Sequence, residues 1–294
     1  MDKNRYLKVL CKLLIYLVVL ITSVVMLLPF LWMISVSLKP AGQVYEYPPR
    51  FIPSTFNFEN YRTAWTRANF SLYFKNTVIF AVIGTFLTVI SCSLGGYTFA
   101  KLRFPGKEVL FGIILFSMMI PFSSVLIPLF LIVKNFPLAG GNNIFGKGGI
   151  GLINTFSGLI LPGIVSGYYI FLFRQFFSML PDELIYAARV DGCSEFRIFL
   201  QIILPLSKPV LATVSIFSFM SRWNALLWPL VILTDPKKRT LQVGLAIFQG
   251  EQLTGAQWNE LLAASAIALI PTILIFLLGQ KYFTTGIALT GMKE

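Results

Sequence analysis

The sequence contains no histidine among its 294 residues. Histidine is the side chain that most often transfers protons near neutral pH, and it is a common ligand of catalytic zinc. Its absence excludes serine–histidine and cysteine–histidine nucleophile pairs and most zinc sites. We therefore expect a protein without catalytic residues and without a metal site.

Charged residues are also scarce, at 12% of the chain, which is about half of their share in soluble domains. Hydrophobic residues make up 56%, so a water-soluble fold could not cover its surface with polar groups. Only three cysteines are present, Cys11, Cys92 and Cys193, and no two of them form a CxxC pair. The cysteines imply no disulfide framework, and the composition indicates a chain that lies in a lipid bilayer.

Long segments without charge divide the chain into candidate membrane spans. Each is at least as long as the roughly 20 residues with which a helix crosses the hydrocarbon core. One further apolar segment, Pro209 to Thr234, contains a single charge, Arg222. We predict an all-α integral membrane protein with six transmembrane helices, at about 13–37, 76–100, 109–133, 157–176, 209–233 and 261–280. Prolines inside these helices are expected to kink them, namely Pro29, Pro121, Pro128, Pro162, Pro229 and Pro271.

Lysine and arginine outnumber acidic residues by 24 to 12, and they flank the apolar segments. Short basic loops stay in the cytoplasm, which predicts cytoplasmic termini and a cytoplasmic loop between the fourth and fifth helices. The first apolar segment is too long for a cleaved signal peptide, so we expect a retained helix. Membrane lipid is an expected partner, whereas nucleic acid is not. The predicted parts are an N-terminal tail with the first helix (1–38), a compact outer loop (39–72), a five-helix core (73–281) and a cytoplasmic tail (282–294).

A glycine-rich segment, Gly141-Asn-Asn-Ile-Phe-Gly146-Lys147, matches most of a Walker A phosphate loop. The next residue is Gly148, so the hydroxyl that binds Mg²⁺ is missing, and no strand precedes the segment. The predicted topology places it outside the cell. We expect a flexible external turn there, and no nucleotide cofactor in this chain.

The segment 181–209, between the predicted fourth and fifth helices, is the most informative. Pro181 suits the first turn of a helix, and Asp182 is favourable near its positive end. Gly192 is expected to end this helix in the left-handed conformation, and Ser194 to cap a second short helix. Two short helices joined at a glycine, with exposed apolar groups, predict a docking element for another protein.

The spacing of small residues in this segment is distinctive. Two alanines, Ala187 and Ala188, are followed after three residues by Gly192 and after nine more by Ile202-Ile-Leu204-Pro205. This spacing resembles the EAA signature of permease subunits of ATP-binding-cassette importers. Shorter matches resemble the carbohydrate, maltose-type branch of that family, namely Phe51-x-Pro53, Asn60-Tyr61, Asn76-Thr77, Arg103-Phe104-Pro105-Gly106, Trp223-Asn224 and Gln280-Lys-Tyr-Phe283.

The resemblance implies a pore-forming permease subunit, in the bacterial inner membrane, that imports a sugar or oligosaccharide. Its implied partners are a second homologous permease, two copies of a cytoplasmic ATPase that bind ATP and Mg²⁺, and an extracytoplasmic solute-binding protein. In that family the EAA loop is a coupling helix in a cleft of the ATPase. The residues assigned to this contact are Asp182, Glu183, Leu184, Tyr186, Ala187, Ala188, Arg189, Asp191, Gly192, Phe196, Phe199 and Pro205.

The resemblance also suggests how these residues divide the contact with the ATPase. The two alanines and Gly192 are expected to allow close approach of the backbones, while Leu184, Phe196 and Phe199 pack. The charged residues assigned to the contact are expected at its rim. The glutamate of the signature is Tyr186 here, so that contact must differ, and Glu183 is a candidate substitute.

Arg222 is a charge at apparent bilayer depth, where such residues usually face a cavity or a partner. The adjacent pair Trp223-Asn224 combines an aromatic ring that suits stacking on a sugar with an amide that suits its hydroxyls. Ligand contact and a conformational lock are both compatible with Arg222. Asn76 is a further candidate for the translocation path, although capping of the second helix is its favoured role.

Two other classes of protein compete with this interpretation. A self-sufficient secondary transporter normally has inverted repeats and intramembrane carboxylates, yet no Asp or Glu lies in any of the six predicted spans. An intramembrane enzyme would need catalytic residues such as intramembrane carboxylates or histidine, and this sequence has neither in its predicted spans. An importer permease for a non-sugar solute, such as a glycerol phosphate ester, is also compatible with the sequence.

Overall fold

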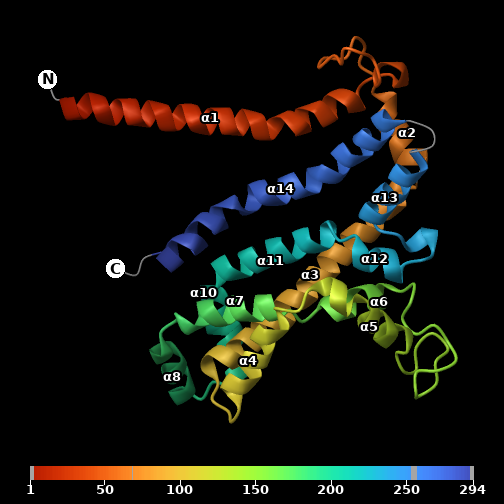
Figure 1. Ribbon diagram of the computed structural model, residues 1–294. Coiled ribbons are helices and arrows are strands. Elements are labelled where there is room, and N and C mark those ends of the chain that lie inside the picture. The colour runs from red at the N-terminus through yellow and green to blue at the C-terminus, as the bar shows by residue number, and fades with distance from the viewer. Residues whose placement is uncertain (1–2, 68, 253–256, 292–294) are drawn as a thin grey trace. The chain divides into compact units, whose positions relative to one another are not determined.

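The computed structural model describes residues 3–67, 69–252 and 257–291. Within these ranges every regular element is a helix, which agrees with the all-α prediction (Figure 1). The chain divides into two compact units, Met1–Phe70 with Leu245–Leu269 and Ser71–Gly244 with Ile270–Glu294. The outermost residues of both predicted tails, 1–2 and 292–294, lie outside the described residues.

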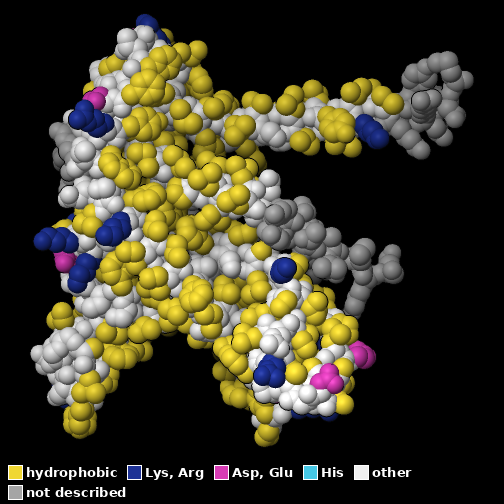
Figure 2. All heavy atoms as spheres, turned by 180° about the vertical axis from the view of Figure 1, so that it is seen from behind, with side chains coloured by type: hydrophobic (Ala, Val, Ile, Leu, Met, Phe, Trp, Pro, Cys, Tyr) yellow, Lys and Arg dark blue, Asp and Glu magenta, His cyan; other side chains and the backbone are white. Residues whose placement is uncertain are grey.

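The first unit is built around one long helix. It contains α1 (Lys3–Ser37), η1 (Ala41–Gln43), α2 (Glu59–Arg67), most of α13 (Leu241–Gln252) and the first part of α14 (Trp258–Gly291). Every side chain from Val9 to Trp32 is exposed, and most of these side chains are apolar (Figure 2). A helix of this kind needs an apolar surrounding such as the lipid of a bilayer.

The outer loop that follows α1 is compact, as expected. The Lys39 side chain is 1% exposed, and its Nζ donates a hydrogen bond to the Arg50 carbonyl at 2.6 Å. The Asn60 amide donates to the carbonyl oxygens of Ser37 and Lys39, each at 2.8 Å. The Asn259 amide in turn donates to Asn60 Oδ1 at 2.9 Å. Buried hydrogen bonds therefore hold the loop against the helices of its own unit.

The second unit contains the remaining helices. In chain order they are α3 (Phe70–Lys101), α4 (Lys107–Ser117), α5 (Phe122–Lys134), α6 (Phe156–Ile160), η2 (Leu161–Gly163), α7 (Gly167–Ser178), α8 (Asp182–Val190), α9 (Glu195–Ile198), the π-helical η3 (Phe199–Ile203), α10 (Leu204–Leu206), α11 (Lys208–Trp223), α12 (Leu227–Ile232) and η4 (Pro236–Lys238). One apolar core joins the second half of α3 to α7, α8 and the start of α11. Helix α8 and the glycine-rich loop after α5 lie at opposite ends of this unit (Figure 1).

The predicted membrane spans fall into two groups. Three helices are long and apolar enough to cross a bilayer by themselves, Val9–Ser37, Phe70–Lys101 and Trp258–Gln280, and they contain the predicted first, second and sixth spans. The others are bent pairs: α4 and α5 meet at 105°, α6–η2 and α7 at 46°, and the run Glu195–Leu206 and α11 at 84°. By length and composition, the described residues provide three spans, or up to six if each bent pair is one.

The predicted helices over 109–133, 157–176 and 209–233 are each divided in the structure and are not single kinked helices. Pro121 precedes α5 with an extended backbone (φ −65°, ψ 139°), because proline lacks the N–H that would continue the preceding helix. In the last pair the bend lies at Ser207, and α11 ends at Trp223, so α12 is separate. Pro29 and Pro271, in contrast, lie inside continuous helices.

The glycine-rich loop is folded, in contrast to the flexible turn that we expected. The Asn142 amide donates to the Lys134 carbonyl at 2.8 Å, and Asn142 Oδ1 accepts from the Gly149 N–H at 2.8 Å. Gly146 has φ +73°, and a Cβ at this position would overlap the Asn135 carbonyl. The glycines thus allow the loop to pack its own backbone closely, which explains the pattern without a phosphate.

Candidate functional site

Helix α8 begins where the sequence predicts. Pro181 is its N-cap residue, and Asp182 and Glu183 lie in its first turn, where the helix dipole favours negative charge. Arg189 lies in the last turn, where a positive charge is favoured. Local sequence alone therefore accounts for both ends of this helix.

The turn after α8 is a Schellman motif. Gly192 has φ +77°, its N–H donates to the Arg189 carbonyl at 3.0 Å, and the Cys193 N–H donates to the Ala188 carbonyl at 2.9 Å. Ser194 then caps α9, because its side chain accepts a hydrogen bond from the Arg197 N–H at 3.4 Å. The predicted pair of short helices joined at a glycine is present in the structure.

One face of this helix pair packs inside the chain. Ile185 and Ala188 of α8 and Phe199 of η3 are 2%, 7% and 3% exposed, and all three belong to the core of the second unit. The expectation that Ala188 and Phe199 meet a partner is therefore wrong for this conformation. Their side chains instead hold α8 against the helices beneath it.

The opposite face is exposed and mixed in character. Leu184, Tyr186 and Phe196 are 42%, 48% and 61% exposed, and they present apolar surface. The Arg189 guanidinium lies 5.8 Å from the centre of the Tyr186 ring. The remaining exposed residues of the predicted coupling set are Asp182, Glu183, Ala187, Arg189, Asp191, Gly192 and Pro205.

Two ion pairs attach α8 to its surroundings, and the sequence analysis missed one partner of each. Lys101, at the end of α3, contacts Asp182 at 2.6 Å and donates to the Leu180 carbonyl at 2.6 Å. The hydrogen bond from the Lys101 ammonium lowers the pKa of the Asp182 carboxyl below its ordinary value. The two residues are far apart in the sequence, and no local pattern indicates their contact.

The second pair lies at the other end of α8. Arg189 Nε contacts Glu195 Oε1 at 2.6 Å, and the Tyr97 hydroxyl donates to Glu195 Oε2 at 2.7 Å. The hydrogen bond to Glu195 raises the pKa of the Arg189 guanidinium above its ordinary value. Both ends of α8 are therefore tied by charge to α3 or α9.

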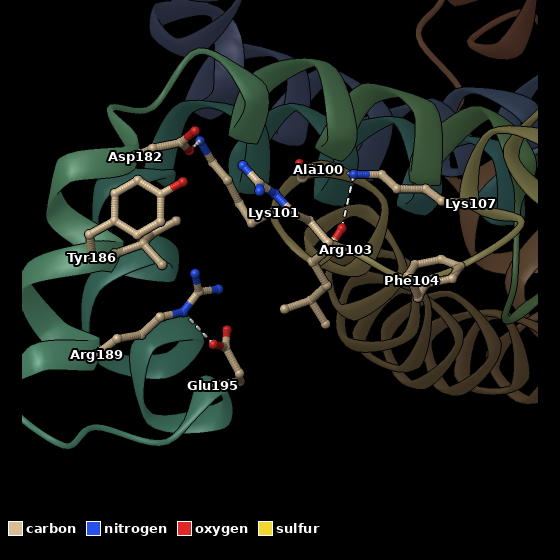
Figure 3. Close-up of a pocket in the computed structure, with 11 residues that line it drawn as sticks. Ala100, Lys101, Arg103, Phe104, Lys107, Asp182, Tyr186, Arg189 and Glu195 are labelled. Carbon is tan, nitrogen blue, oxygen red and sulfur yellow. Dashed lines mark hydrogen bonds and ion pairs between the residues drawn. The ribbon is translucent and has the colours of Figure 1, made fainter.

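A pocket of about 660 Å³ lies between α8 and the turn that joins α3 to α4. Figure 3 shows Lys101, Arg103 and Lys107 on one wall and Asp182, Tyr186 and Arg189 on the other. We call it the basic pocket. Its charged lining residues are Lys101, Arg103, Lys107, Asp182, Arg189 and Glu195.

Arg222 is buried and hydrogen-bonded on α11. Its NH2 group donates to Thr88 Oγ1 at 2.6 Å and to the Gly163 carbonyl at 2.7 Å, and its NH1 group donates to Ser218 Oγ. These partners belong to α3, η2 and α11, so the guanidinium links three elements. Its hydrogen-bond pattern is that of a structural link, although its side chain also lines a cavity.

That cavity, of about 680 Å³, has a largely apolar lining that includes several aromatic rings and a few serine hydroxyls. Tyr168 and Tyr169 at the start of α7, Trp228 of α12 and Ser221 lie along it with Arg222. We call it the aromatic cavity. Rings and hydroxyls of this kind suit the faces and hydroxyl groups of a sugar.

The other predicted translocation residues lie elsewhere. Trp223 is 1% exposed and packs between Phe74 and Phe219, so its ring is not accessible to a sugar in this conformation. The exposed Asn224 side chain donates to the Met220 carbonyl at 3.0 Å. The structure brings Arg222 alone of these three to the aromatic cavity.

Asn76 does not cap a helix, which corrects the favoured prediction. Helix α3 begins at Phe70, so Asn76 lies inside it. The Asn76 amide is buried and donates to the carbonyl oxygens of Lys237 and Arg239, each at 3.0 Å. It therefore ties α3 to the segment between α12 and α13.

Comparisons with known proteins assign the family. A sequence profile described as "Binding-protein-dependent transport system inner membrane component" matches residues 92–288. The arabinooligosaccharides transport system permease of Bacillus subtilis is 33% identical over 276 residues, covering 92% of each chain. The diacetylchitobiose uptake system permease of Streptomyces coelicolor is 32% identical, covering 88% of this chain and 82% of the relative. The sn-glycerol-3-phosphate transport system permease of Salmonella typhi is 35% identical, covering 83% and 84%.

Solved structures agree with this assignment. A chain of a bacterial ABC transporter involved in the import of the acidic polysaccharide alginate superposes with a TM-score of 0.77. Its sequence identity is 26%, and the match covers 96% of this chain and 98% of that chain. The predicted resemblance to importer permeases is thereby confirmed. The chain belongs to the family of binding-protein-dependent transport system inner membrane components and is a multi-pass membrane transport permease.

Proposed function

We propose that this chain is the pore-forming permease subunit of an ATP-driven importer for a sugar or oligosaccharide in the bacterial inner membrane. Relatives that transport arabinooligosaccharides and diacetylchitobiose, and the likeness to an alginate importer, support a carbohydrate cargo. The chain itself is a transport subunit without catalysis. ATP and Mg²⁺ bind to two copies of a separate cytoplasmic ATPase, and a second homologous permease completes the pore.

The observation that carries this proposal is the exposed face of α8 and α9. Leu184, Tyr186 and Phe196 form an apolar surface, and Glu183 and Asp191 lie on the same exposed segment. Such a surface fits a cleft on a partner protein better than it fits water. With Tyr186 in place of the signature glutamate, Glu183 provides the carboxylate for a basic group on the ATPase.

The packing of α8 supplies a route for the coupled motion. A displacement of α8 acts on α3 through the Lys101–Asp182 contact, and on α11 through the helical run that continues from α9. Arg222 on α11 is hydrogen-bonded to α3 and η2. ATP-driven closure of the ATPases thus moves helices that line the aromatic cavity, where the cargo delivered by the binding protein passes.

Gly192 offers a direct test of docking. A Cβ at Gly192 would meet nothing within 4 Å, and Gly192 is exposed, so a large side chain there is positioned to obstruct a docked partner. We expect Gly192→Trp to reduce uptake and ligand-stimulated ATP hydrolysis by about tenfold or more, the effect of losing a central interface contact. Both are measured in proteoliposomes that contain the co-purified complex.

Gly106 is a matched control for this substitution. It has φ +78°, close to the +77° of Gly192, and its Cβ position is equally open. Gly106→Trp therefore introduces the same backbone strain outside α8, and we expect it to keep stimulated hydrolysis. Normal stimulation in Gly192→Trp, with normal amounts in the membrane, contradicts the docking assignment.

A glycerol phosphate ester is the second candidate cargo, because the glycerol-3-phosphate permease of Salmonella typhi is 35% identical to this chain. Uptake of radiolabelled oligosaccharides and of glycerol-3-phosphate by the same proteoliposomes separates the two. Transport that requires no ATP and runs on an ion gradient would instead identify a secondary transporter.

A further inference from the structure

The basic pocket has an excess of positive charge that its own residues do not neutralise. Two of its cations are paired, Lys101 with Asp182 and Arg189 with Glu195. The pocket is left with Arg103 and Lys107 and no further carboxylate in its lining. A pocket with this balance attracts an anion.

The two remaining cations differ in what holds them. Lys107 Nζ donates to the carbonyl oxygens of Ala100 and Leu102, at 3.3 and 3.0 Å, which positions it without cancelling its charge. The exposed Arg103 makes no side-chain hydrogen bond or ion pair with another residue in the described part of the chain. Its guanidinium therefore has all of its donors available for a ligand.

The nearest other carboxylate is engaged elsewhere. Glu108 lines a shallow neighbouring pocket that shares Arg103, Phe104 and Lys107 with the basic pocket. Its Oε2 lies 3.5 Å from Arg174 NH2, so its charge is directed to α7. In the described part of the chain it forms no ion pair with Arg103 or Lys107.

An apolar stripe continues from this turn along α4. Val109, Ile113 and Phe116 are 70%, 61% and 68% exposed, and their spacing of four and three residues places them on one face of the helix. This face begins two residues after Lys107. A ligand with an anionic end in the pocket would thus have apolar surface directly beside it, in a protein that lies in a membrane.

We propose that the basic pocket binds the phosphate headgroup of an anionic phospholipid, with its acyl chains along the apolar stripe of α4. Arg103 is the main phosphate ligand, and Lys107 adds a second positive charge. The stripe favours a lipid over a soluble phosphate, which would use the pocket alone. This inference depends on the membrane location of the chain and is independent of its cargo.

Native mass spectrometry of the full-length, delipidated protein with its co-purified subunits tests the proposal. The complex is titrated with phosphatidylglycerol, with zwitterionic phosphatidylcholine and with inorganic phosphate. We expect preferential binding of phosphatidylglycerol, about fivefold weaker in Arg103→Gln, which is the effect expected for one basic residue near a lipid surface. Arg103→Lys keeps the charge and should retain most of the binding.

Two further variants sharpen this result. Arg197→Gln removes the same charge from an exposed arginine of α9 that does not line the pocket, and we expect unchanged lipid binding. Asp182→Asn releases Lys101 from its ion pair, so phosphatidylglycerol should bind more tightly. Because one variant weakens binding and the other strengthens it, general misfolding cannot produce both results.

Several outcomes would overturn the proposal. Equal binding of phosphatidylglycerol by the wild type and Arg103→Gln would show that Arg103 does not bind the phosphate. Displacement of the lipid by millimolar inorganic phosphate shows a site for a soluble anion. Loss of a co-purified protein subunit in Arg103→Gln, with lipid binding unchanged, shows that the pocket is part of a protein interface.

Discussion

Arg222 illustrates how a buried charge is stabilised without a carboxylate. Its side chain is 8% exposed, and its hydrogen-bond partners in the described structure are a serine, a threonine and two carbonyl groups. These neutral oxygens accept hydrogen bonds from both terminal nitrogens of the guanidinium, NH1 and NH2. The residue that the sequence singles out as unusual thus links three helical elements, and it borders the aromatic cavity.

Gly84 is the residue that makes room for Arg222, and this leads to a prediction at single-residue scale. A Cβ at Gly84 would overlap Arg222 Nε, whereas a Cβ at Gly112, also within a helix, would meet nothing within 4 Å. We expect Gly84→Ala to destabilise the protein by about 1–3 kcal/mol because of overpacking. Gly112→Ala should be neutral or stabilising by up to about 1 kcal/mol.

Thermal unfolding of the detergent-solubilised protein measures both substitutions. A Gly84→Ala variant that unfolds at the same temperature as Gly112→Ala would show that Arg222 can shift without loss. The comparison is informative because both substitutions replace a helical glycine with the same side chain.

At the scale of elements, α8 depends on a contact that lies outside it. The Lys101 side chain is 4% exposed and binds both Asp182 and the Leu180 carbonyl, so one buried ammonium orients the start of the helix. The remaining attachments are the Arg189–Glu195 ion pair at the other end of α8 and the apolar contacts of Ile185 and Ala188. Removing the charge should therefore loosen the first turn of α8 and leave its second half in place.

We predict that Lys101→Met increases amide hydrogen exchange in residues 182–186 by about fivefold or more, which corresponds to the loss of a charge-assisted hydrogen bond. Lys208→Met, at an exposed lysine of α11, serves as the matched control. Hydrogen-exchange mass spectrometry resolves residues 182–186 from the second half of α8. Unchanged protection of α8 in Lys101→Met would mean that the Arg189–Glu195 ion pair and apolar packing suffice to position the helix.

At the scale of the whole molecule, orientation in the membrane is the main prediction. The glycine-rich loop and the α8–α9 segment lie at opposite ends of the second unit (Figure 1). Basic residues in short segments predict a cytoplasmic location for the α8–α9 segment. The glycine-rich loop should then be extracytoplasmic.

Cysteine labelling checks this orientation. The exposed residues Lys147 and Arg197 are replaced singly by cysteine after Cys11, Cys92 and Cys193 have been removed. A membrane-impermeant maleimide should label Lys147→Cys in intact spheroplasts and Arg197→Cys only in inverted vesicles. Labelling of both from the same side would contradict the predicted topology.

Features that depend on neighbours within one helical turn were predictable from the sequence. The start of α8 at Pro181, its end at Gly192 and the cap at Ser194 follow from backbone and side-chain preferences that act over four residues or fewer. The apolar spans follow from the thickness of a bilayer. The family resemblance rests on the same local spacing, which folding does not alter.

Long-range packing decided the rest. Burial of Ala188, Phe199 and Trp223 depends on helices distant in the sequence, and so does the choice of Lys101 as the partner of Asp182. The bends between paired helices also could not be predicted from proline positions alone. Pro121 lies at a break between two helices, whereas Pro29 and Pro271 lie inside continuous helices. The sequence by itself determined an all-helical membrane protein, since composition and the length of the apolar segments suffice for that, and its local residue spacing carried the resemblance to importer permeases. Only the tertiary structure decided which side chains remain exposed to a partner, a cargo or a lipid, because exposure depends on contacts between residues far apart in the chain.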